Sequence, residues 1–573
     1  MVNLIIDGKA IAAREGSTIL AAAKENGIRI PTLCWFKELN EVGACRVCAV
    51  EVKGEKKLLA ACNTVVSEGM EVITNSERVR EARRVNLQLI LSAHNCNCPS
   101  CKRNGNCALQ SLCEEMNIHA VPYETKLNKT ASILNTPLLR DSTKCIGCLR
   151  CVNVCDKIQN IGVWQLIGSG AHAKVTVKGG MTLDQAGCSL CGQCITRCPV
   201  GALIARDDTE KAFRLLSDPE KITVIQIAPA VRAAWGDALE LDPAVATEKR
   251  MAAAAKALGA KYVFDTNFTA DLTIMEEGSE FLARMKNKGG SKMPMFTSCC
   301  PGWVRFVKMH YPALTDNLST AKSPQQMFGA VVKTYFAGKL GVEADKINCI
   351  SVMPCTAKKY ECDVNEVNAT EKDVDLVLTT REFTRMLREK GIDAASLPEA
   401  EFDSPLGTGS GAAVIFGATG GVMEAALRSA HYLITGKNPD ADAFKAVRAE
   451  GNSGIRVLEA EIGGVKVRAA VASGLGNARV LCEEAIAGKS PYDFIEIMAC
   501  PGGCAGGGGQ PIKDGEELAG ERGDRLYAID KKNAIRFSHE NPEVQALYRD
   551  FLGEPLSHKS HELLHTEQSK WSL

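Results

Sequence analysis

Two runs of regularly spaced cysteines constrain this chain more than any other feature of its sequence. Residues 145 to 155 and residues 188 to 198 both follow the spacing Cys-x2-Cys-x2-Cys-x3-Cys. This spacing is typical of iron-sulfur ligation, and a doubled run predicts two neighbouring 4Fe-4S clusters. The chain has 25 cysteines in all, and because it shows no leader sequence we expect them to bind metal rather than to form disulfides.

The doubled run resembles that of bacterial two-cluster ferredoxins, in which the fourth cysteine of each run binds the other cluster. One departure is Asp156, which stands where proline usually follows the fourth cysteine. The resemblance pairs three cysteines of each run with the last cysteine of the opposite run. The expected ligand sets are Cys145, Cys148, Cys151 with Cys198, and Cys188, Cys191, Cys194 with Cys155.

Two further groups of candidate ligands precede these runs. In the first, three close cysteines and a distant one follow the plan of plant-type 2Fe-2S ferredoxins, although ten residues separate the first two where four are usual. In the second, an imidazole replaces one thiolate, which should raise the potential of the cluster. Zinc is the alternative for both groups. The groups are Cys34, Cys45, Cys48 and Cys62 for a 2Fe-2S cluster, and His94, Cys98, Cys101 and Cys107 for a 4Fe-4S cluster.

Composition and the N-terminus exclude several classes of function. The formal net charge is zero, and neither a basic excess nor an acidic tail points to nucleic acid or to a basic partner. No apolar run approaches the roughly 18 residues of a membrane span, so we expect a cytoplasmic protein. Residues 2–8 and 9–13 predict a β-hairpin, and Ser17 is the expected N-cap of a helix that ends before Gly27.

After Phe213 the pattern of the sequence changes, and predicted apolar strands alternate with predicted helices. Residues 222–228, 262–264, 348–353 and 375–379 are predicted strands, and residues 252–259 a predicted helix. This alternation indicates an α/β domain with reactive residues at the ends of strands. Three loops bent by glycine or proline contain four more cysteines, the ligand number of another 4Fe-4S cluster. These are Cys300, Cys355, Cys500 and Cys504.

The three loops resemble the signature motifs of the iron-only (FeFe) hydrogenases. They are Met295 to Trp303 with the paired Cys299 and Cys300, Met353 to Lys359, and Met498 to Cys504. The resemblance implies an H-cluster, in which a 4Fe-4S cluster is joined through Cys504 to a diiron site that carries CO, cyanide and a dithiolate. It implies that Lys358 pairs with a cyanide, and that the diiron site is lined by Ala228, Pro229, Ala230, Gln325, Met353, Phe416, Gly417 and Met498.

A row of polar residues lies on one face of a predicted helix. Thr273, Glu277, Glu280 and Arg284 follow one another at spacings of four, three and four. Taken alone, they would form a solvated stripe with one ion pair. The resemblance implies instead a proton relay, because carboxylates and hydroxyls within hydrogen-bond reach can carry protons through a dry interior. From surface to metal, the relay would be Arg284, Glu280, Ser319, Glu277 and Cys299.

The last member of this relay is expected to be an ordinary thiol. With a pKa of about 8.5, a cysteine side chain can donate and recover a proton near neutral pH. Cys299 is therefore expected to exchange protons with the diiron site.

Two motifs match other functions only in part. His561 to His565 fits the zinc-protease pattern His-Glu-x-x-His, but no downstream ligand follows, so a packing helix is predicted. The glycine segments 417–421 and 474–479 are incomplete dinucleotide fingerprints. Direct binding of NAD by this chain is therefore not expected.

The sequence thus predicts an iron-only hydrogenase that interconverts H2 with two protons and two electrons. The expected fold is multidomain α+β and α/β. Its predicted parts are a 2Fe-2S ferredoxin-like (β-grasp) domain at 1–78, a histidine-ligated 4Fe-4S domain at 79–125, a 2x4Fe-4S ferredoxin-like domain at 126–212, and a catalytic H-cluster domain at 213–573.

The segment after Cys500 suggests the electron partner. It looks more like the hydrogenase subunits of NAD-linked, electron-bifurcating complexes than like single-chain enzymes. Such a subunit would need a flavin- and NAD-binding partner and a small 2Fe-2S subunit besides ferredoxin, and the diiron site would need maturation proteins. The alternatives are a stand-alone ferredoxin-dependent hydrogenase and a non-catalytic hydrogenase-like sensor or iron-sulfur protein.

Overall fold

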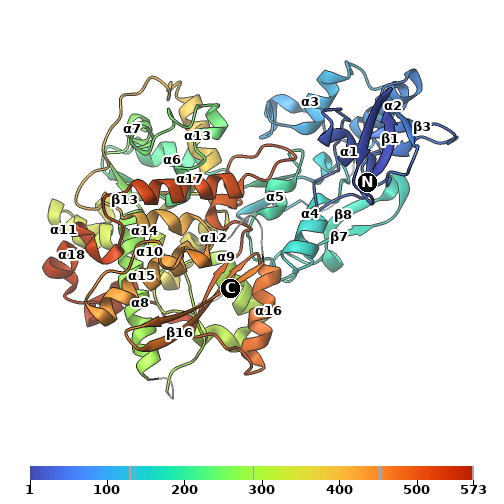
Figure 1. Cartoon of the computed structure of the whole chain (residues 1–573). Coiled ribbons are helices and arrows are strands. Elements are labelled where there is room, and N and C mark those ends of the chain that lie inside the picture. Colours follow the sequence, from blue (N-terminus) through green and yellow to red (C-terminus); the bar gives the residue numbers. More distant parts are fainter. Residues whose placement is uncertain (128–131, 134–135, 288–289, 449–453, 571–573) are drawn as a thin grey trace.

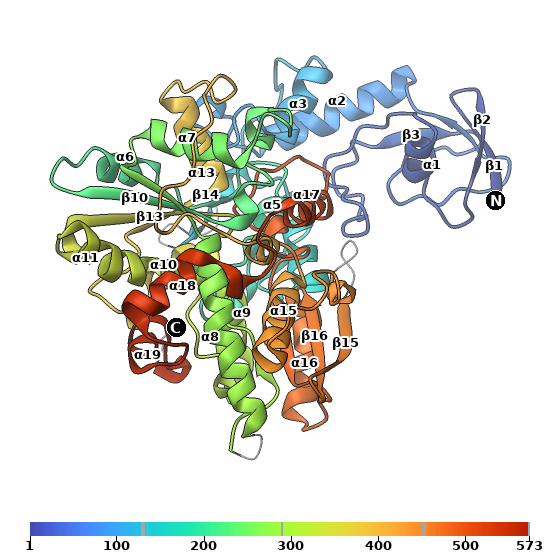
Figure 2. The ribbon, with the colours of Figure 1, turned by 60° about the vertical axis from the view of Figure 1, so that its left-hand side comes forward.

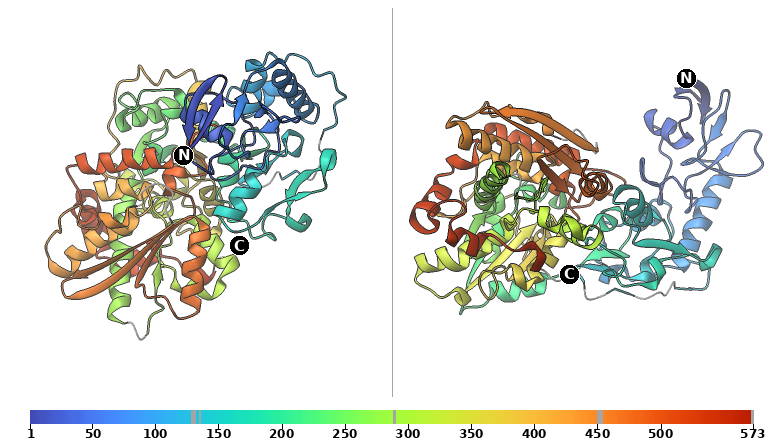
Figure 3. Two further views of the ribbon diagram at one scale, coloured as in Figure 1. Left: turned by 45° about the vertical axis from the view of Figure 1, so that its right-hand side comes forward. Right: turned by 90° about the horizontal axis from the view of Figure 1, so that it is seen from below.

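The structure is a computed structural model that describes residues 1–127, 132–133, 136–287, 290–448 and 454–570. Helices and strands are mixed in several domains. Figure 1 shows the residues after about 213 as one large body, with the N-terminal domain to one side of it. The turned view in Figure 2 and the view from below in Figure 3 show the same separation. No described helix is long and apolar enough to cross a membrane.

The N-terminal domain is built on a five-stranded sheet in the order β2-β1-β5-β3-β4. The predicted hairpin is confirmed, because β1 and β2 pair antiparallel around a turn with positive φ at Asp7 and Gly8. The predicted N-cap is wrong by one residue: Thr18 accepts the N–H of Ala21, whereas Ser17 donates to the Arg14 carbonyl. The elements are β1 Val2–Ile6, β2 Lys9–Ala13, α1 Ile19–Glu25, β3 Ala49–Val52, β4 Leu59–Ala60 and β5 Glu71–Ile73.

Short elements connect this domain to the catalytic body. One buried arginine in this connecting region contacts both the N-terminal domain and the catalytic body. Arg150 donates to the carbonyls of Leu33 (2.8 Å) and Trp35 (2.9 Å) in the first domain, and pairs with Asp514 (2.7 Å) near the C-terminus. A buried guanidinium with this many partners fixes the domains relative to one another. The connecting elements are α2 Glu77–Ser92, α3 Ala108–Glu115, β6 Leu138–Arg140, α4 Arg150–Asn153, β7 Trp164–Ile167, β8 Lys174–Val177, α5 Gln193–Arg197 and β9 Leu203–Ala205.

The catalytic body contains two four-stranded sheets. The first is parallel in the order β11-β10-β13-β14, and each end of the four predicted strands agrees with it to within one residue. In the second, β12-β17-β16-β15, only the outer β15 runs antiparallel. The strands are β10 Ile222–Ile227, β11 Tyr262–Asp265, β12 Met295–Phe296, β13 Ile347–Met353, β14 Leu376–Thr379, β15 Ile455–Ile462, β16 Val465–Ser473 and β17 Phe494–Met498.

Helices cover both sheets, and the helix predicted at 252–259 is the C-terminal part of α7. Its caps follow from the sequence: Thr247 accepts the N–H of Arg250, and Gly259 has the left-handed φ of 115°. The helices are α6 Thr209–Leu216, α7 Glu248–Leu258, α8 Asn267–Lys286, α9 Pro301–His310, α10 Pro324–Val331, α11 Ala337–Leu340, α12 Ala357–Asp363, α13 Thr380–Glu389, α14 Gly411–Val414, α15 Gly421–Thr435, α16 Leu475–Ile486, α17 Ala519–Lys532, α18 Pro542–Leu547 and α19 His558–Leu564.

The parallel strands of the two sheets send their carboxyl ends toward one place. The segments that follow β10 and β13 bring Ala228 and Cys355 there, and those that follow β12 and β17 bring Cys300 and Cys500. Loops at the carboxyl ends of parallel strands are the usual location of binding sites in α/β folds. The three cysteine motifs therefore meet because of the topology of two sheets, although two hundred residues separate the first from the last.

Candidate active site

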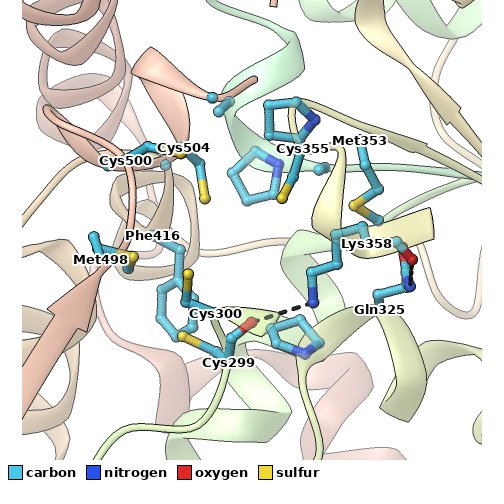
Figure 4. A pocket seen from close by; sticks show the side chains of 18 of the residues that line it. Cys299, Cys300, Gln325, Met353, Cys355, Lys358, Phe416, Met498, Cys500 and Cys504 are labelled. Atoms are coloured by element: carbon cyan, nitrogen blue, oxygen red, sulfur yellow. Dashed lines mark hydrogen bonds between the residues drawn. The ribbon is translucent and has the colours of Figure 1, made fainter. Parts of the chain in front are cut away.

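A cavity of about 80 Å³ lies where these strand ends meet. Figure 4 shows the cysteines, methionines and Lys358 arranged around a single space. All the residues that the resemblance assigned to the two halves of the H-cluster line this cavity. They are Cys300, Cys355, Cys500 and Cys504, with Ala228, Pro229, Ala230, Gln325, Met353, Lys358, Phe416, Gly417 and Met498.

The glycines around Cys504 are needed because backbone packs directly on backbone. A Cβ on Gly503 would lie 2.7 Å from the Thr419 nitrogen, and one on Gly507 would lie 2.3 Å from the Pro354 oxygen. Gly503 also has a φ of 76°, which other residues rarely adopt. The glycine run thus lets the Cys504 loop reach the loop of Cys355.

Lys358 is a buried ammonium at the edge of the cavity. It donates to the Cys299 carbonyl (3.2 Å) and pairs with Glu361 (2.8 Å). Burial acts to lower the pKa of Lys358, but the Glu361 carboxylate outweighs it and the pKa is raised above its ordinary value. An ammonium has three N–H donors, so after these two partners one remains for an anion in the cavity.

The residues fit the group that the resemblance implies. Four thiols on converging loops match the ligand number of a 4Fe-4S cluster. The rest of the lining is apolar apart from a few polar side chains, and the Gln325 Oε1 atom is buried without a hydrogen-bond partner among the described residues. A cavity of this kind suits a compact cofactor that water must not reach.

The polar residues predicted to form a relay lie behind Cys299. Arg284 on α8 pairs with Glu280 at 2.6 Å, and the Ser319 hydroxyl donates to the other Glu280 oxygen at 2.8 Å. Arg284 is half-buried, whereas Glu280, Ser319 and Glu277 are buried. Side-chain exposure therefore falls from Arg284 through Glu280 to Ser319 and Glu277. Thr273 does not join these contacts, because its hydroxyl donates to the Thr269 carbonyl.

Glu277 occupies the gap between these contacts and Cys299. Neither of its carboxyl oxygens has a hydrogen-bond partner among the described residues. Burial, and then the charge on Glu280, raise the pKa of Glu277 to about 8. Burial, and then the charge on Glu277, also raise the pKa of the Cys299 thiol well above its usual range. The expectation of an ordinary thiol that titrates near neutral pH is therefore wrong for Cys299.

From the raised pKa of Glu277 we predict how the stability of the fold depends on pH. Between about pH 4.5 and pH 8 this carboxyl is ionised in the unfolded chain but protonated in the folded chain, so it lowers the free energy of unfolding as the pH rises. We expect the unfolding temperature of Glu277→Gln, relative to the wild type, to be higher at pH 8 than at pH 5. Each unit of pKa shift corresponds to about 1.4 kcal/mol. Thermal unfolding of both proteins under anaerobic conditions measures this.

The matched control is Glu562→Gln, which removes an exposed carboxyl from α19. An equal difference between Glu277→Gln and the wild type at the two pH values would contradict the protonation of Glu277.

The cysteines of the N-terminal domain converge as predicted. Hydrogen bonding between Cys34 and Cys45 raises the pKa of Cys34 and lowers that of Cys45 to about 6. The pair Cys48 and Cys62 interacts in the same way. Charges also act between the two pairs: that of Cys48 raises the pKa of Cys34, and those of Cys34 and Cys45 raise the pKa of Cys62. The charge of Cys45 likewise acts to raise the pKa of Cys48. Four thiols therefore meet in one place.

The next group contains His94, which is buried, and three half-buried cysteines. Burial lowers the pKa of His94, and its Nδ1 atom has no hydrogen-bond partner among the described residues. A neutral imidazole with a free nitrogen is suited to bind metal. Cys113 lies near this group although it belongs to none of the predicted ligand sets. Burial, and then the charges on Cys96, Cys107 and Cys98, raise its pKa to about 11.

The structure brings the cysteines of the doubled run together in two neighbouring groups. A small cavity is lined by the first set, Cys145, Cys148, Cys151 and Cys198. In the second set, burial and then the charges on Cys191 and Cys155 raise the pKa of Cys188 to about 12. Cys191 also lies beside the cavity cysteines, because the Cys500 thiol donates to the Cys191 carbonyl at 3.8 Å.

The sequence missed some of the residues that line the main cavity. Thr266, Ala270 and Pro324 are among them, and they come from the start of α8 and α10. Small or apolar residues at helix starts carry no chemical signature, so only the tertiary arrangement reveals them. His565 was predicted to lie in a packing helix, but it follows α19 and contacts residues beside the relay.

The fold and the site define a class of protein: an iron-sulfur oxidoreductase with several cluster-binding domains attached to a buried catalytic centre. Known families match each part. Residues 221–508 match the iron only hydrogenase large subunit, C-terminal domain. The others are a 2Fe-2S iron-sulfur cluster binding domain (1–77), the NADH-ubiquinone oxidoreductase-G iron-sulfur binding region (83–122), a 4Fe-4S dicluster domain (144–202) and the iron hydrogenase small subunit (516–570).

Two known proteins are similar over the whole chain, and a solved structure is similar over part of it. The NADP-reducing hydrogenase subunit HndD of Solidesulfovibrio fructosivorans is 46% identical over 582 residues, which cover 100% of this chain and 99% of the relative. Iron hydrogenase 1 of Clostridium pasteurianum is 38% identical over 579 residues and 100% of both chains. A structure of a variant of apo [FeFe]-hydrogenase HydA1 from Chlamydomonas reinhardtii has a TM-score of 0.55 at 41% identity, over 63% of this chain and 98% of that chain.

The chain therefore belongs to the iron-only hydrogenase family. It is an enzyme that interconverts H2 with protons and electrons, and it carries 2Fe-2S and 4Fe-4S cluster domains. These matches favour iron-sulfur clusters over the zinc sites that the spacing of the first two cysteine groups also allowed.

Proposed function

We propose that this chain is the hydrogenase subunit of an NAD(P)-linked, electron-bifurcating complex, with H2 converted in the cavity at the strand ends. One observation carries the assignment of the site: the cavity combines four convergent thiols with a buried ammonium and with a row of proton-carrying side chains behind Cys299. A non-catalytic iron-sulfur protein would need the four thiols but not the proton-carrying side chains behind Cys299.

The cofactors that we propose are one 2Fe-2S cluster, three accessory 4Fe-4S clusters and an H-cluster, held by the ligand sets predicted from the sequence in the four domains 1–78, 79–125, 126–212 and 213–573. When bound, the diiron part of the H-cluster supplies the chemistry on H2. Cys300, Cys355, Cys500 and Cys504 would hold this cofactor, with Cys504 nearest its diiron part. The remaining donor of Lys358 would fix an anionic ligand in the cavity.

Proton movement is assigned to the row behind Cys299. Cys299 would exchange a proton with the cavity and Glu277 would exchange one with Cys299, since both are buried and the charge on Glu277 raises the pKa of Cys299. Ser319 and Glu280 would continue the path to the half-buried Arg284. General acid-base groups in contact typically contribute about 10² to 10⁴ in rate.

Electrons would pass between the cavity and the second cysteine set of the ferredoxin-like domain. The two loops touch: Thr356 donates to the Leu190 carbonyl (2.8 Å), and Gln193 donates to the Gly506 carbonyl (2.8 Å). A Cβ on Gly508 would lie 2.5 Å from the Cys191 carbonyl oxygen. No side chain separates the backbone of these two ligand loops at that point.

The electron partner is inferred from similarity. The relative HndD is named a subunit of an NADP-reducing hydrogenase, and it matches this chain from end to end. We therefore propose a flavin- and NAD(P)-binding subunit and a small 2Fe-2S subunit as partners, with ferredoxin as a second acceptor and maturation proteins for the diiron site. We also propose a cytoplasmic location, where these carriers are reduced and reoxidised.

The isolated chain should reduce artificial dyes with H2 but should not reduce NAD or NADP. The reason is that its glycine segments are incomplete dinucleotide motifs, and Gly417 and Gly474 lie in the packed catalytic body. Anaerobic assays with a viologen dye, ferredoxin, NAD and NADP on the same preparation measure this.

Each acceptor result has a distinct meaning. Direct reduction of NAD or NADP by the isolated chain would contradict the need for a partner subunit. Rapid reduction of ferredoxin by the isolated chain, unaffected by added partner subunits, would favour the stand-alone enzyme.

A further inference from the structure

The C-terminal segment 548–568 packs along the predicted proton relay. Three main-chain or amide contacts hold the loop that contains Ser319. Lys322 N–H donates to the Leu564 carbonyl (2.8 Å), Thr566 N–H donates to the Thr320 carbonyl (2.8 Å), and the Gln568 amide donates to the Ser319 carbonyl (2.9 Å). The segment thus forms a short ladder with residues 319–322.

The same segment holds α8 through Glu276. This buried carboxylate accepts the Tyr548 hydroxyl (2.5 Å), the Leu556 N–H (2.9 Å) and the His565 Nε2–H (3.0 Å). Burial acts to raise the pKa of Glu276, but these hydrogen bonds, with His565 first, outweigh it and the pKa is lowered. Glu276 is therefore an anion that docks α8 on the C-terminal segment, directly beside Glu277 in sequence.

His565 joins the two attachments. Because a carboxylate only accepts hydrogen bonds, the network assigns the proton to Nε2 of His565. The Nδ1 atom of the same ring lies within hydrogen-bond distance of the Thr320 hydroxyl, at 2.8 Å. One imidazole thus connects Glu276 on α8 with Thr320 on the Ser319 loop, and it is buried at both contacts.

These two elements also meet at the relay itself. Glu280, one turn after Glu276 on α8, accepts the Ser319 hydroxyl (2.8 Å) and the Thr320 N–H (3.0 Å). The relay contact between Glu280 and Ser319 therefore depends on the separation between α8 and the loop. His565 spans the same two elements from the other side.

We propose that His565 and Glu276 are positioning residues for proton transfer, which keep Glu280 and Ser319 in hydrogen-bond contact. This inference rests on the proposed relay. It assigns a role in the reaction to the His-Glu-x-x-His segment, whose second histidine is the connecting residue. The segment lies in the part of the chain that matches the iron hydrogenase small subunit. Proton transfer along hydrogen bonds is sensitive to small displacements, and a misplacement of about 1 Å can cost about 100-fold in rate.

The test uses the full chain with its complete cofactors. We expect His565→Ala to lower H2 evolution with a reduced dye by about 10- to 100-fold. The solvent deuterium isotope effect on turnover should rise, while iron content and the infrared bands of the CO and cyanide ligands stay unchanged. His565→Gln, whose amide can donate to Glu276 and accept from Thr320, should restore a large part of the activity.

Two further variants separate positioning from general damage. Thr320→Val removes only the hydroxyl that contacts His565 and keeps the N–H that contacts Glu280. It should reproduce the raised isotope effect even if His565→Ala fails to fold. His561→Ala is the matched control, because this exposed ring lies against His565, with ring centres 4.4 Å apart, and takes no part in the contacts of His565 with Glu276 and Thr320. Its turnover should equal that of the wild type.

A parallel measurement on Glu280→Gln distinguishes this inference from the relay on which it rests. Slow turnover of Glu280→Gln with normal turnover and isotope effect of Thr320→Val and His565→Ala would overturn the positioning role and keep the relay. Normal turnover of Glu280→Gln would overturn both. Slow turnover of Thr320→Val without a raised isotope effect would also overturn the positioning role, because proton transfer would not be the slowed step.

Discussion

Replacing Cys299 by serine is expected to lower the turnover of H2 by at least about 100-fold, with all clusters retained. Cys299 lines the cavity beside Cys300, and burial with the charge on Glu277 raises the pKa of its thiol. The thiol is therefore protonated at rest, and it can give its proton to the cavity and recover one from Glu277. A serine hydroxyl is a much weaker acid than a thiol and should perform this exchange slowly.

The comparison with Cys299→Asp makes this test specific. Aspartate restores a titratable group of similar reach, so this variant should keep a substantial part of the activity. Cys482→Ser is the matched control, because it makes the same change at a buried cysteine on α16 that belongs to none of the predicted ligand sets. H2 evolution, iron content and infrared bands should be measured for all three variants.

Full activity of Cys299→Ser, with the infrared bands intact, would show that the relay does not end at Cys299. Glu277 would then have to reach the cavity through water.

Expression of the chain without its maturation proteins is expected to give an iron-sulfur protein with no measurable hydrogenase activity. The described residues offer thiols for the accessory clusters and for the 4Fe-4S part of the H-cluster, as the convergent sets in the front domains and the cavity show. The cavity side chains offer no source of CO or cyanide. Iron and sulfide content, visible absorption and dye-linked activity of the anaerobically purified chain measure this.

The control is the same chain produced together with the maturation proteins, which should be active at equal iron-sulfur content. Full activity in a host that lacks those proteins would contradict the assignment of a diiron site to this cavity.

The sequence predicted the site better than it predicted local detail. The cysteine spacing and the three motifs identified the lining of the cavity, because metal ligands are recognisable as residue types wherever they fall. The cap at Thr18 was missed by one residue, since Ser17 and Thr18 have equivalent side chains and only the backbone decides between them. The strands were predicted well because β10 and β13 are buried on both faces and read as continuous apolar runs.

Other features could not be read from the sequence. The pKa of Glu277 depends on burial and on Glu280, and neither burial nor the absence of a hydrogen-bond partner among the described residues follows from helical spacing. The contact of His565 with Thr320 joins residues 245 positions apart. A five-residue motif gives no sign of such a partner, so a packing helix was the reasonable prediction and was incomplete.

The glycines at the junction of the front and catalytic domains limit how such enzymes can be recombined. A Cβ on Gly192 would lie 2.5 Å from the Thr356 hydroxyl oxygen, and one on Gly508 would lie 2.7 Å from the α-carbon of Gly192. The surfaces of the ferredoxin-like and catalytic domains are thus packed so closely that neither glycine has room for a side chain. A chimaera that joins this catalytic domain to the ferredoxin-like domain of another protein will dock correctly only if the donor also has glycine at the position of Gly192.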